Sequence, residues 1–374
     1  MQHAIDKWLS EKLNERKVKN IWRSLPAQNN GIDFTSNDYL GFAQSEKLFH
    51  AIQQKIESLP KKNGSSGSRL LSGNSSYTEQ VESKLAHIFK SQAALIFNSG
   101  YSANLAVLSS IPQKGDTILY DSLAHASLKD GARLSLATRH SFRHNDLEDL
   151  ERKIKASKGK KYIVVESIYS MDGDECPLNE IVKLAERHQA AIILDEAHST
   201  GVAGPQGAGY CVEENLQDKV DIRIYTFGKA MGVHGACVAG SKALIGYLIN
   251  FARPFIYTTA LSQHQVASID CAFEFLSSNL DLQHMLAEKI SLYLRAIGKL
   301  SNRTASLSAI QTILCPGKHA AKEMSEVLQN SGFDVRPILH PTVPEGKERL
   351  RICLHTFNSD DEINSLAQAL VAVV

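Results

Sequence analysis

The chain has 374 residues, of which 43% are hydrophobic and 22% are charged, and its formal net charge is +1. This is the composition of an ordinary globular protein, and the length allows two domains. A net charge so close to zero gives no electrostatic reason to expect nucleic acid or an anionic membrane as a partner. No apolar run reaches the roughly 18 to 20 residues of a membrane span, and the polar first segment has no signal-peptide core, so neither an anchor nor a leader is expected.

The cysteines are spread along the chain and form neither a CxxC pair nor a Cys/His cluster with the spacing of metal ligands. Structural zinc is therefore not expected. Isolated thiols in a chain of this length are typical of a reducing compartment, which predicts a cytoplasmic location. The six positions are Cys176, Cys211, Cys237, Cys271, Cys315 and Cys353.

The first 45 residues are expected to form a helix followed by an arm. Apolar residues at roughly helical spacing predict a partly amphipathic helix near the N-terminus. A short strand is expected at Ile32 to Phe34, and it leads into the turn-rich segment Ser36 to Gly41. The apolar residues of the predicted helix are Ile5, Trp8, Leu9, Leu13 and Val18.

A loop rich in glycine and serine follows between Asn63 and Gly73. It lacks the GK[ST] ending of a phosphate-binding P-loop, which argues against nucleotide hydrolysis. Such a loop is most simply a mobile surface segment. Leu70 and Leu71 lie inside it, however, and they suggest that it packs against something.

The middle of the chain alternates short apolar runs with segments long enough for crossover helices, such as Leu147 to Ile154 and Leu178 to Arg187. This alternation predicts an α/β domain built on a mainly parallel sheet. Ligands of such sheets bind beyond the carboxyl ends of the strands. The predicted strands are Ala93 to Phe97, Thr117 to Tyr120, Tyr162 to Glu166, Ala191 to Asp195, Ile222 to Phe227 and Ala236 to Gly240.

The pattern changes from Ser262 onward and predicts a smaller α+β domain. A long helical stretch, Gln263 to Leu300, comes first, and Asp360 to Val373 forms a closing helix. The sequence thus divides into an N-terminal helix and arm (1–45), a large domain (46–262) and a small C-terminal domain (263–374). The predicted strands of the small domain are Ile310 to Leu314, Val335 to Ile338 and Arg349 to Leu354.

A candidate anion site follows the first large-domain strand. Ser99, Gly100 and Tyr101 stand where that strand gives way to a helix, and backbone N–H groups at a helix start bind phosphate. Many strand–helix turns carry Ser-Gly, so this signal is weak alone. The hydroxyl of Thr226 could reach the same phosphate from another strand.

Two histidines and a serine follow other strands. His125 could stack on a planar ligand, although a hydrogen-bonded loop histidine is the simpler interpretation. His198 lies three residues beyond Asp195 and could hydrogen-bond the same ligand. Ser170 could hydrogen-bond the same ligand, or its side chain could simply stabilise the turn in which it lies.

Two charged residues stand where buried strands end. Asp195 follows Ile-Ile-Leu, and Lys229 lies between Gly228 and Gly232 among apolar neighbours. Each alone has a simpler explanation, as a strand-end residue or a surface charge. Together, in this order, they are the anchors that pyridoxal 5'-phosphate needs: a carboxylate that keeps the pyridine nitrogen protonated, and an amine that holds the aldehyde as a Schiff base. A lysine in such a pocket should have a lowered pKa.

Arg351 is the last candidate, because it interrupts an apolar strand pattern. A guanidinium there could hold a substrate carboxylate with two parallel hydrogen bonds. A structural ion pair is an equally good explanation of this residue.

These segments, in this order, resemble the signatures of the α-oxoamine synthase family of fold-type-I pyridoxal phosphate enzymes. The resemblance covers nearly the whole chain. It implies a large cofactor-binding domain on a mainly parallel sheet and a smaller C-terminal α+β domain. The segments that carry it are Ser36 to Gly41, Gly67 to Gly73, Asp195 to Ser199, Thr226 to Lys229 and Pro341 to Pro344.

The resemblance also implies roles for the candidate residues. Lys229 would hold the cofactor and move protons, Asp195 would pair with the pyridine nitrogen, and His125 would stack on the ring. The phenolic oxygen side would be contacted by His198 and Ser170, the phosphate by Ser99, Gly100, Tyr101 and Thr226, and the amino-acid carboxylate by Asn37 and Arg351. Family members are homodimers with the active site at the interface, so Thr258 or Thr259 would reach the partner's phosphate.

The activity that the resemblance implies is condensation of an amino acid with an acyl thioester, with loss of CO2 and the thiol. Within the family the chain looks most like the biotin-pathway members, which use L-alanine and a pimeloyl thioester. Glycine with acetyl-CoA and serine with a long-chain acyl-CoA remain alternatives, as do an ordinary aminotransferase and a catalytically silent dimer partner. Lys229 argues against the silent partner.

Three departures from the family pattern weaken the prediction of the acyl substrate more than that of the cofactor. The arm before Asn37 is shorter than expected. A histidine often found after the glycine-rich loop is replaced near Thr78. An arginine sometimes found before Pro341 is absent, where Leu339 and His340 stand, although Arg336 is near enough to substitute.

Overall fold

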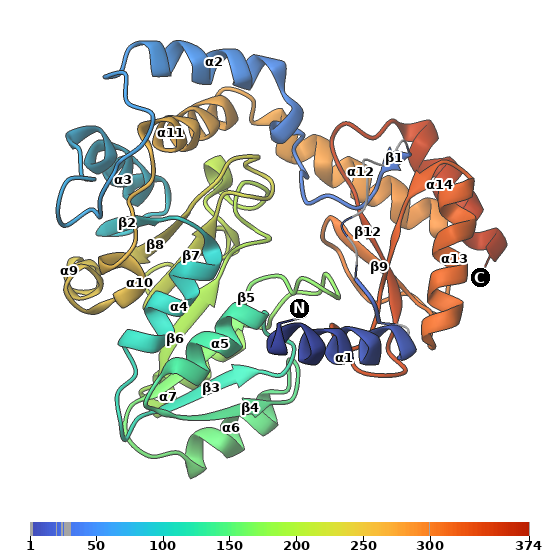
Figure 1. Ribbon diagram of the computed structural model, residues 1–374, viewed down its shortest axis with the longest axis horizontal. Coiled ribbons are helices and arrows are strands. Elements are labelled where there is room, and N and C mark those ends of the chain that lie inside the picture. The colour runs from blue at the N-terminus through green and yellow to red at the C-terminus, as the bar shows by residue number, and fades with distance from the viewer. Residues whose placement is uncertain (1–2, 20, 24, 26–30, 299, 374) are drawn as a thin grey trace.

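The computed structural model describes residues 3–19, 21–23, 25, 31–298 and 300–373. Figure 1 shows a large body around one sheet and a smaller body at the C-terminal end of the chain, with residues 31–45 and helix α12 (Asp281–Ile297) running between them; helix α1 (Ala4–Val18) stands near the N-terminus. No helix in the described part of the chain is long and apolar enough to cross a membrane.

The large body is built on a seven-stranded sheet with the order β2-β8-β7-β6-β5-β3-β4. Its strands run parallel except β8, which is antiparallel to both of its neighbours. The carboxyl ends of the parallel strands therefore meet at one edge, where ligands of such sheets bind. The strands are β2 (Ala93–Phe97), β3 (Thr117–Asp121), β4 (Thr138–Phe142), β5 (Lys161–Glu166), β6 (Ala191–Asp195), β7 (Ile222–Thr226) and β8 (Ala236–Gly240).

Helices cover both faces of this sheet, because its strands, apart from the edge strand β4, are apolar on both sides. One face packs against α4 (Gly100–Ser110), α5 (Ala126–Leu134), α9 (Lys242–Phe251) and α10 (Arg253–Ile256). The other packs against α2 (Glu46–Glu57), α3 (Ser76–Ile88) and α11 (Gln263–Ser277) at one end, and against α6 (Leu147–Ala156), α7 (Leu178–His188) and α8 (Tyr210–Glu213) at the other. Short 3-10 turns occur at Phe42–Gln44 and Pro205–Gly207.

The small body is an antiparallel three-stranded sheet, β11-β12-β9, covered by helices. The arm joins it, since β1 (Ile32–Asp33) pairs in parallel with β10 (Phe333–Asp334) and Phe34 lies in its core. The remaining elements are β9 (Ile310–Leu314), α13 (Lys318–Asn330), β11 (Arg336–Ile338), β12 (Arg349–Cys353) and α14 (Asp360–Val373).

The predicted α/β class with a mainly parallel sheet is confirmed, and the predicted strands lie within a residue or two of the observed ones. The edge strand β4 was not predicted, because its sequence, Thr-Arg-His-Ser-Phe, is polar and its side chains are mostly exposed. The long helical stretch is two helices, α11 and α12, separated near Ser278. The limits proposed for the domains stay a prediction.

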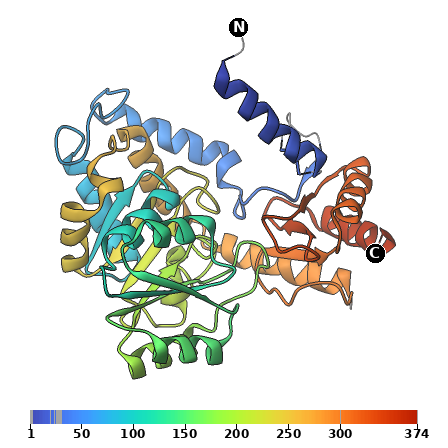
Figure 2. The ribbon, with the colours of Figure 1, turned by 60° about the horizontal axis from the view of Figure 1, so that its bottom comes forward.

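The apolar residues of the glycine-rich loop and of helix α1 are exposed in the single chain. Leu70 and Leu71 are 49% and 87% exposed, so the glycine-rich loop does not bury them. Helix α1 exists as predicted, but its apolar residues, including Trp8 at 53%, are also exposed. Figure 2 shows why: α1 extends away from the large body.

Candidate active site

A cavity of about 280 Å³ lies beyond the carboxyl ends of the parallel strands. Its lining brings together residues from the turns after β2, β3, β6 and β7, which are far apart in the sequence. Of the residues predicted for the site, the cavity is lined by Asn37, Ser99, Gly100, Tyr101, His125, Asp195, His198, Thr226 and Lys229.

Asp195 ends strand β6 and is only 3% exposed. Asn104 Nδ2 donates to one carboxylate oxygen at 2.8 Å, and the backbone N–H of Ala197 donates to the other at 2.9 Å. The Asn104 amide also donates to Ser127 Oγ at 2.9 Å, so it is itself fixed. The carboxylate is thus held in one orientation at the cavity wall, where it suits a protonated ring nitrogen.

Lys229 follows β7 in a tight turn and lines the same cavity. The turn is closed by bonds from Gly232 N to Lys229 O and from Val233 N to Phe227 O, and Gly232 has a φ of 63°. Desolvation lowers the pKa of Lys229, and the charges of Asp195 and Glu166 only partly oppose it. The neutral, nucleophilic form of the Lys229 amine is therefore more populated at a given pH than that of an exposed lysine.

His125 caps helix α5 on the cavity wall. Its Nδ1 lies 2.7 Å from Ser127 Oγ, and its backbone N–H donates to Glu166 Oε1 at 2.5 Å. Desolvation lowers the pKa of His125, while burial together with the charge of Asp195 raises that of Glu166 to about 8. Ring and backbone of His125 are thus both fixed, as a group that stacks on a ligand requires.

His198 lies deeper, 5% exposed, with Nδ1 2.8 Å from the hydroxyl of Tyr39. Burial holds the pKa of His198 well below its usual range, and the charges of Lys229 and Arg351 act in the same direction. A neutral imidazole fixed by Tyr39 is able to hydrogen-bond a phenolic oxygen through its other nitrogen.

The start of helix α4 forms a cradle for an anion. Ser99 caps the helix, and the N–H groups of Gly100 and Tyr101 belong to its first turn, which has no acceptors within the helix. The buried hydroxyl of Thr226 has no hydrogen-bond partner in the described part of the chain. A Cβ at Gly100 would overlap the Thr226 methyl group, so only glycine leaves this cradle open. The residues present fit a cofactor phosphate.

The substrate side is formed where β12 of the small body meets the arm. Arg351 is 8% exposed, and its Nη2 donates to Asn37 Oδ1 at 2.8 Å. Asn37 lines the cavity, whereas Arg351 stands behind it. Arg336, the possible substitute for a missing arginine, is instead paired with Asp334, with Nε 2.5 Å from Oδ1.

Ser170 is not among the residues that line the cavity, and its carbonyl accepts from Arg351 Nε of β12 at 2.7 Å. Its expected contact with a phenolic oxygen stays a prediction. Thr258 is also off the cavity of its own chain: its hydroxyl accepts from Asn98 Nδ2 at 3.1 Å, beside a separate small pocket.

The sequence did not single out the residues that hold the candidate groups, namely Asn104, Ser127, Tyr39 and Glu166. Asn104 gave a signal that could have been used, since it is a polar residue among the buried apolar residues Ala103, Ala106 and Val107 of α4. The others act through contacts between distant segments, for which the sequence carries no local sign.

Comparison with known proteins agrees with the chemistry of this site. Residues 29–370 match the family described as aminotransferase class I and II. An 8-amino-7-oxononanoate synthase of Emericella nidulans is 38% identical, covering 97% of this chain and 94% of the relative. The 8-amino-7-oxononanoate synthase 2 of Bacillus subtilis is 36% identical, covering 99% and 98%.

Two solved structures are also similar over most of the chain. Serine palmitoyltransferase from S. paucimobilis, solved with a bound adduct of PLP and myriocin, has a TM-score of 0.89 at 25% identity, covering 100% of this chain and 98% of that one. The 8-amino-7-oxononanoate synthase of Francisella tularensis has a TM-score of 0.78 at 30% identity, covering 92% and 96%. The chain belongs to the class I and II aminotransferase family, and within it to the fold-type-I α-oxoamine synthases.

Proposed function

We propose that this protein is a pyridoxal phosphate-dependent 8-amino-7-oxononanoate synthase, an acyltransferase of biotin biosynthesis. It would condense L-alanine with a pimeloyl thioester and release CO2 and the free thiol. The observation that carries the proposal is one cavity that holds Asp195, Lys229 and an open phosphate cradle in a chain 38% identical to a synthase of that name.

The fit of these groups supports a specific place for the cofactor. Its phosphate would sit at the start of α4 beside Thr226, its ring nitrogen would face Asp195, and Lys229 would hold its aldehyde. When bound, it supplies a protonated ring that accepts the electron pair left on the amino acid's α-carbon. His125 would cover one face of the ring and keep water from it.

The chain's own residues then direct the reaction. Lys229 Nζ takes the α-proton of L-alanine and returns a proton after CO2 has left. Asn37 and Arg351 hold the substrate carboxylate, and so decide which bond of the α-carbon stands perpendicular to the ring and breaks. His198, kept neutral by its surroundings, hydrogen-bonds the phenolic oxygen.

We further propose a cytoplasmic homodimer with the active sites at the interface. The exposed apolar residues of α1 and of the glycine-rich loop support it, because large apolar side chains left bare in one chain mark interaction sites. Thr258 or Thr259 of one chain would reach the phosphate in the other.

The alternative with a specific observation behind it is serine palmitoyltransferase, since structures of that enzyme match with high TM-scores. The serine palmitoyltransferase structures are 25 to 28% identical to this chain, whereas the 8-amino-7-oxononanoate synthase of Emericella nidulans is 38% identical. The test is a product assay with L-alanine, glycine and L-serine, each with pimeloyl-CoA, acetyl-CoA or palmitoyl-CoA. The highest kcat/KM with L-alanine and pimeloyl-CoA supports the proposal; a preference for serine with palmitoyl-CoA overturns it.

A further inference from the structure

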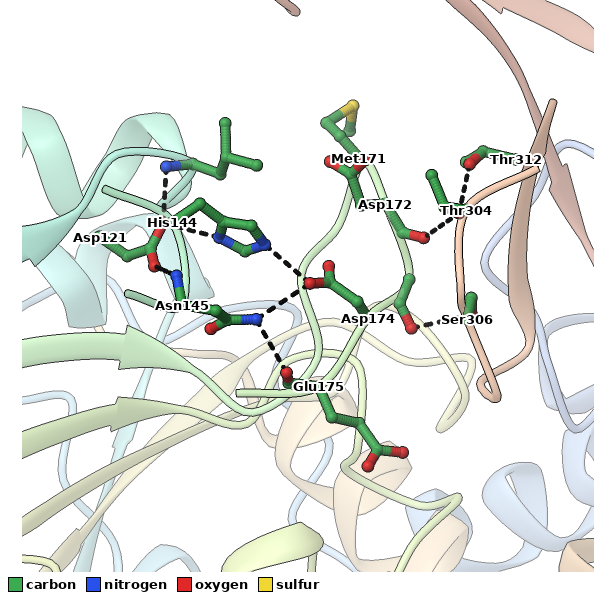
Figure 3. A network of polar contacts seen from close by, with 12 residues as sticks. Asp121, His144, Asn145, Met171, Asp172, Asp174, Glu175, Thr304, Ser306 and Thr312 are labelled. Atoms are coloured by element: carbon green, nitrogen blue, oxygen red, sulfur yellow. Dashed lines mark hydrogen bonds and ion pairs between the residues drawn. The ribbon is translucent and has the colours of Figure 1, made fainter. Parts of the chain in front are cut away.

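One loop joins the two halves of the site. The bridging loop, residues 167–175, leaves β5 and lies against the small body. The carbonyl of Gly173 accepts from Ser306 Oγ at 2.9 Å and from Ser308 Oγ at 2.8 Å. Thr304 Oγ1 donates to the carbonyl of Asp172 at 3.0 Å (Figure 3). Gly173 has a φ of 73°, and a Cβ there would overlap the carbonyl of Ile310. The loop is therefore seated closely on the start of β9.

The same loop contacts both arginines of β12. The carbonyl of Ser170 accepts from Arg351 Nε, and Arg349 pairs with the carboxylate of Asp172. Arg349 Nη1 also donates to the carbonyl of Met171 at 3.3 Å. Because Arg351 Nη2 reaches Asn37 at the cavity wall, the position of the Ser170 carbonyl helps to set the direction of that guanidinium.

On its other side the loop is tied to the large body through His144. Its Nε2 lies 2.7 Å from Asp174 Oδ2, and its Nδ1 lies 2.9 Å from the fully buried Asp121 (Figure 3). Asn145 Nδ2 adds bonds of 3.0 Å to Asp174 Oδ2 and to the carbonyl of Glu175. Burial would lower the pKa of His144, but the two carboxylates raise it to about 10, so both of its nitrogens donate.

Asp121 also controls the turn that carries His125. Its carboxylate accepts from the backbone N–H of Leu123 at 2.8 Å, and its carbonyl accepts from that of Ala124 at 3.0 Å. Ion pairs thus link Asp121, His144 and Asp174. The carbonyl of Asp174 accepts from the backbone N–H of Tyr169 at 2.9 Å, and the next residue along the backbone is Ser170, whose carbonyl meets Arg351 on the substrate side.

We propose that His144 is a positioning residue for amino-acid binding: by clamping Asp174 to Asp121 it seats the bridging loop, and through the Ser170 carbonyl it aims Arg351 at the substrate carboxylate. The inference rests on the proposed function, since it takes Arg351 as the ligand of that carboxylate. A purely structural His144 would instead affect folding without selecting one substrate.

The test is a double-mutant cycle on the holoenzyme with His144→Gln and Arg351→Lys. The Kd of L-alanine is read from the cofactor absorbance, and the KM of pimeloyl-CoA is measured in parallel. In the parent background, His144→Gln should raise the Kd of L-alanine about five- to tenfold, which is within the range for residues that are energetically coupled. In the Arg351→Lys background, the same substitution should raise the Kd of L-alanine by less than about twofold. The KM of pimeloyl-CoA should change less than the Kd of L-alanine. His140→Gln, on the exposed part of β4, is the matched control.

Hydrogen exchange in the cofactor-free protein gives a second readout. The backbone N–H groups of Tyr169 and Gly173, which are bonded within the loop, should exchange faster in His144→Gln than in His140→Gln. If His144→Gln does not fold, Gly173→Ala displaces the loop from its other side and should raise the same Kd.

Three results would overturn the inference: an unchanged Kd in a folded variant, an equal effect in both Arg351 backgrounds, or unchanged exchange of the loop. An Arg351→Lys variant that binds L-alanine normally would remove the proposed role of Arg351, and the inference with it. Weakened binding by Arg351→Lys, with no effect of His144→Gln, would remove the inference alone.

Discussion

Lys229 combines a lowered pKa with a place between two glycines at the cavity. Because its neutral form is favoured, attachment of the cofactor should stay efficient at neutral pH and slow only as the pH falls and protonates the amine. Lys229→Ala should lose all measurable turnover, and borohydride reduction should no longer fix the cofactor to the chain. Mass spectrometry of the reduced protein checks this. Lys160→Ala, on an exposed residue, is the control, and cofactor retained covalently in Lys229→Ala would refute the assignment.

Asn104 helps to orient the carboxylate of Asp195. Its amide donates to the Asp195 carboxylate, as the Ala197 N–H also does, and hydrogen bonds to a charged group contribute about 1.5 to 3 kcal/mol. Asn104→Ala should therefore lower kcat about tenfold or more while the protein still folds. Steady-state kinetics measures the loss. Ser109→Ala on the same helix is the matched control, and equal kcat in the two variants would contradict the role given to Asn104.

At the level of elements, the anion site at the start of α4 depends on the absence of a side chain at Gly100. Gly100→Ala would push a methyl group against Thr226 and narrow the phosphate cradle. The Kd of pyridoxal phosphate should rise about tenfold or more, because backbone donors and the helix dipole lose their hold on the anion. Equilibrium titration of the cofactor-free protein tests this. Gly246→Ala, where nothing lies within 4 Å of the new methyl, should bind as the parent does.

The ion pairs of His144 with Asp121 and Asp174 predict that the stability of the folded chain depends on pH. The pKa of His144 is raised to about 10 in the folded chain, against about 6.5 for an unfolded histidine. Its ion pairs with Asp121 and Asp174 therefore contribute fully below about pH 6.5, and the contribution is lost as the pH rises to about 10. The difference in Tm between the parent and His144→Gln should be largest near pH 6 and shrink toward pH 10. A difference that grows with pH would contradict the sign.

The elements that the sequence predicted best are those whose burial is uniform. Ala191 to Asp195 is apolar until its last residue, so both the strand and its terminal carboxylate could be read from the pattern. Strand β4 could not, because it lies at the sheet edge with polar side chains. The orientation of Ser170 could not either, since it depends on a contact with Arg351, 181 positions further along the chain.

At the scale of the whole molecule, the exposed apolar residues predict association. The protein should sediment as a species of about twice its 41.1 kDa chain mass. If Thr258 completes the partner's site, mixed dimers of Lys229→Ala and Thr258→Ala chains should contain one unaltered site and be more active than either parent variant. Analytical ultracentrifugation and an activity assay of mixed chains measure both. A fully active monomer would contradict the account.

The candidate site could be predicted because its chemistry is recorded as residue types at strand ends, where Asp195, Lys229 and His198 stand. What remained hidden was the support around them. Tyr39 reaches His198 across 159 positions, and His144 joins two loops that the sequence gives no reason to pair. Such contacts arise only when the sheet is assembled.

The purified holoenzyme should be incubated with L-alanine labelled with carbon-13 at its carboxyl group and with an oxo acid as a possible amino acceptor, in the presence and in the absence of pimeloyl-CoA. With pimeloyl-CoA present, we expect labelled CO2 and unlabelled 8-amino-7-oxononanoate in equal amounts, and without the thioester we expect no CO2. Transfer of the amino group to an oxo acid with the carboxyl label retained would instead identify an ordinary aminotransferase and contradict the claim.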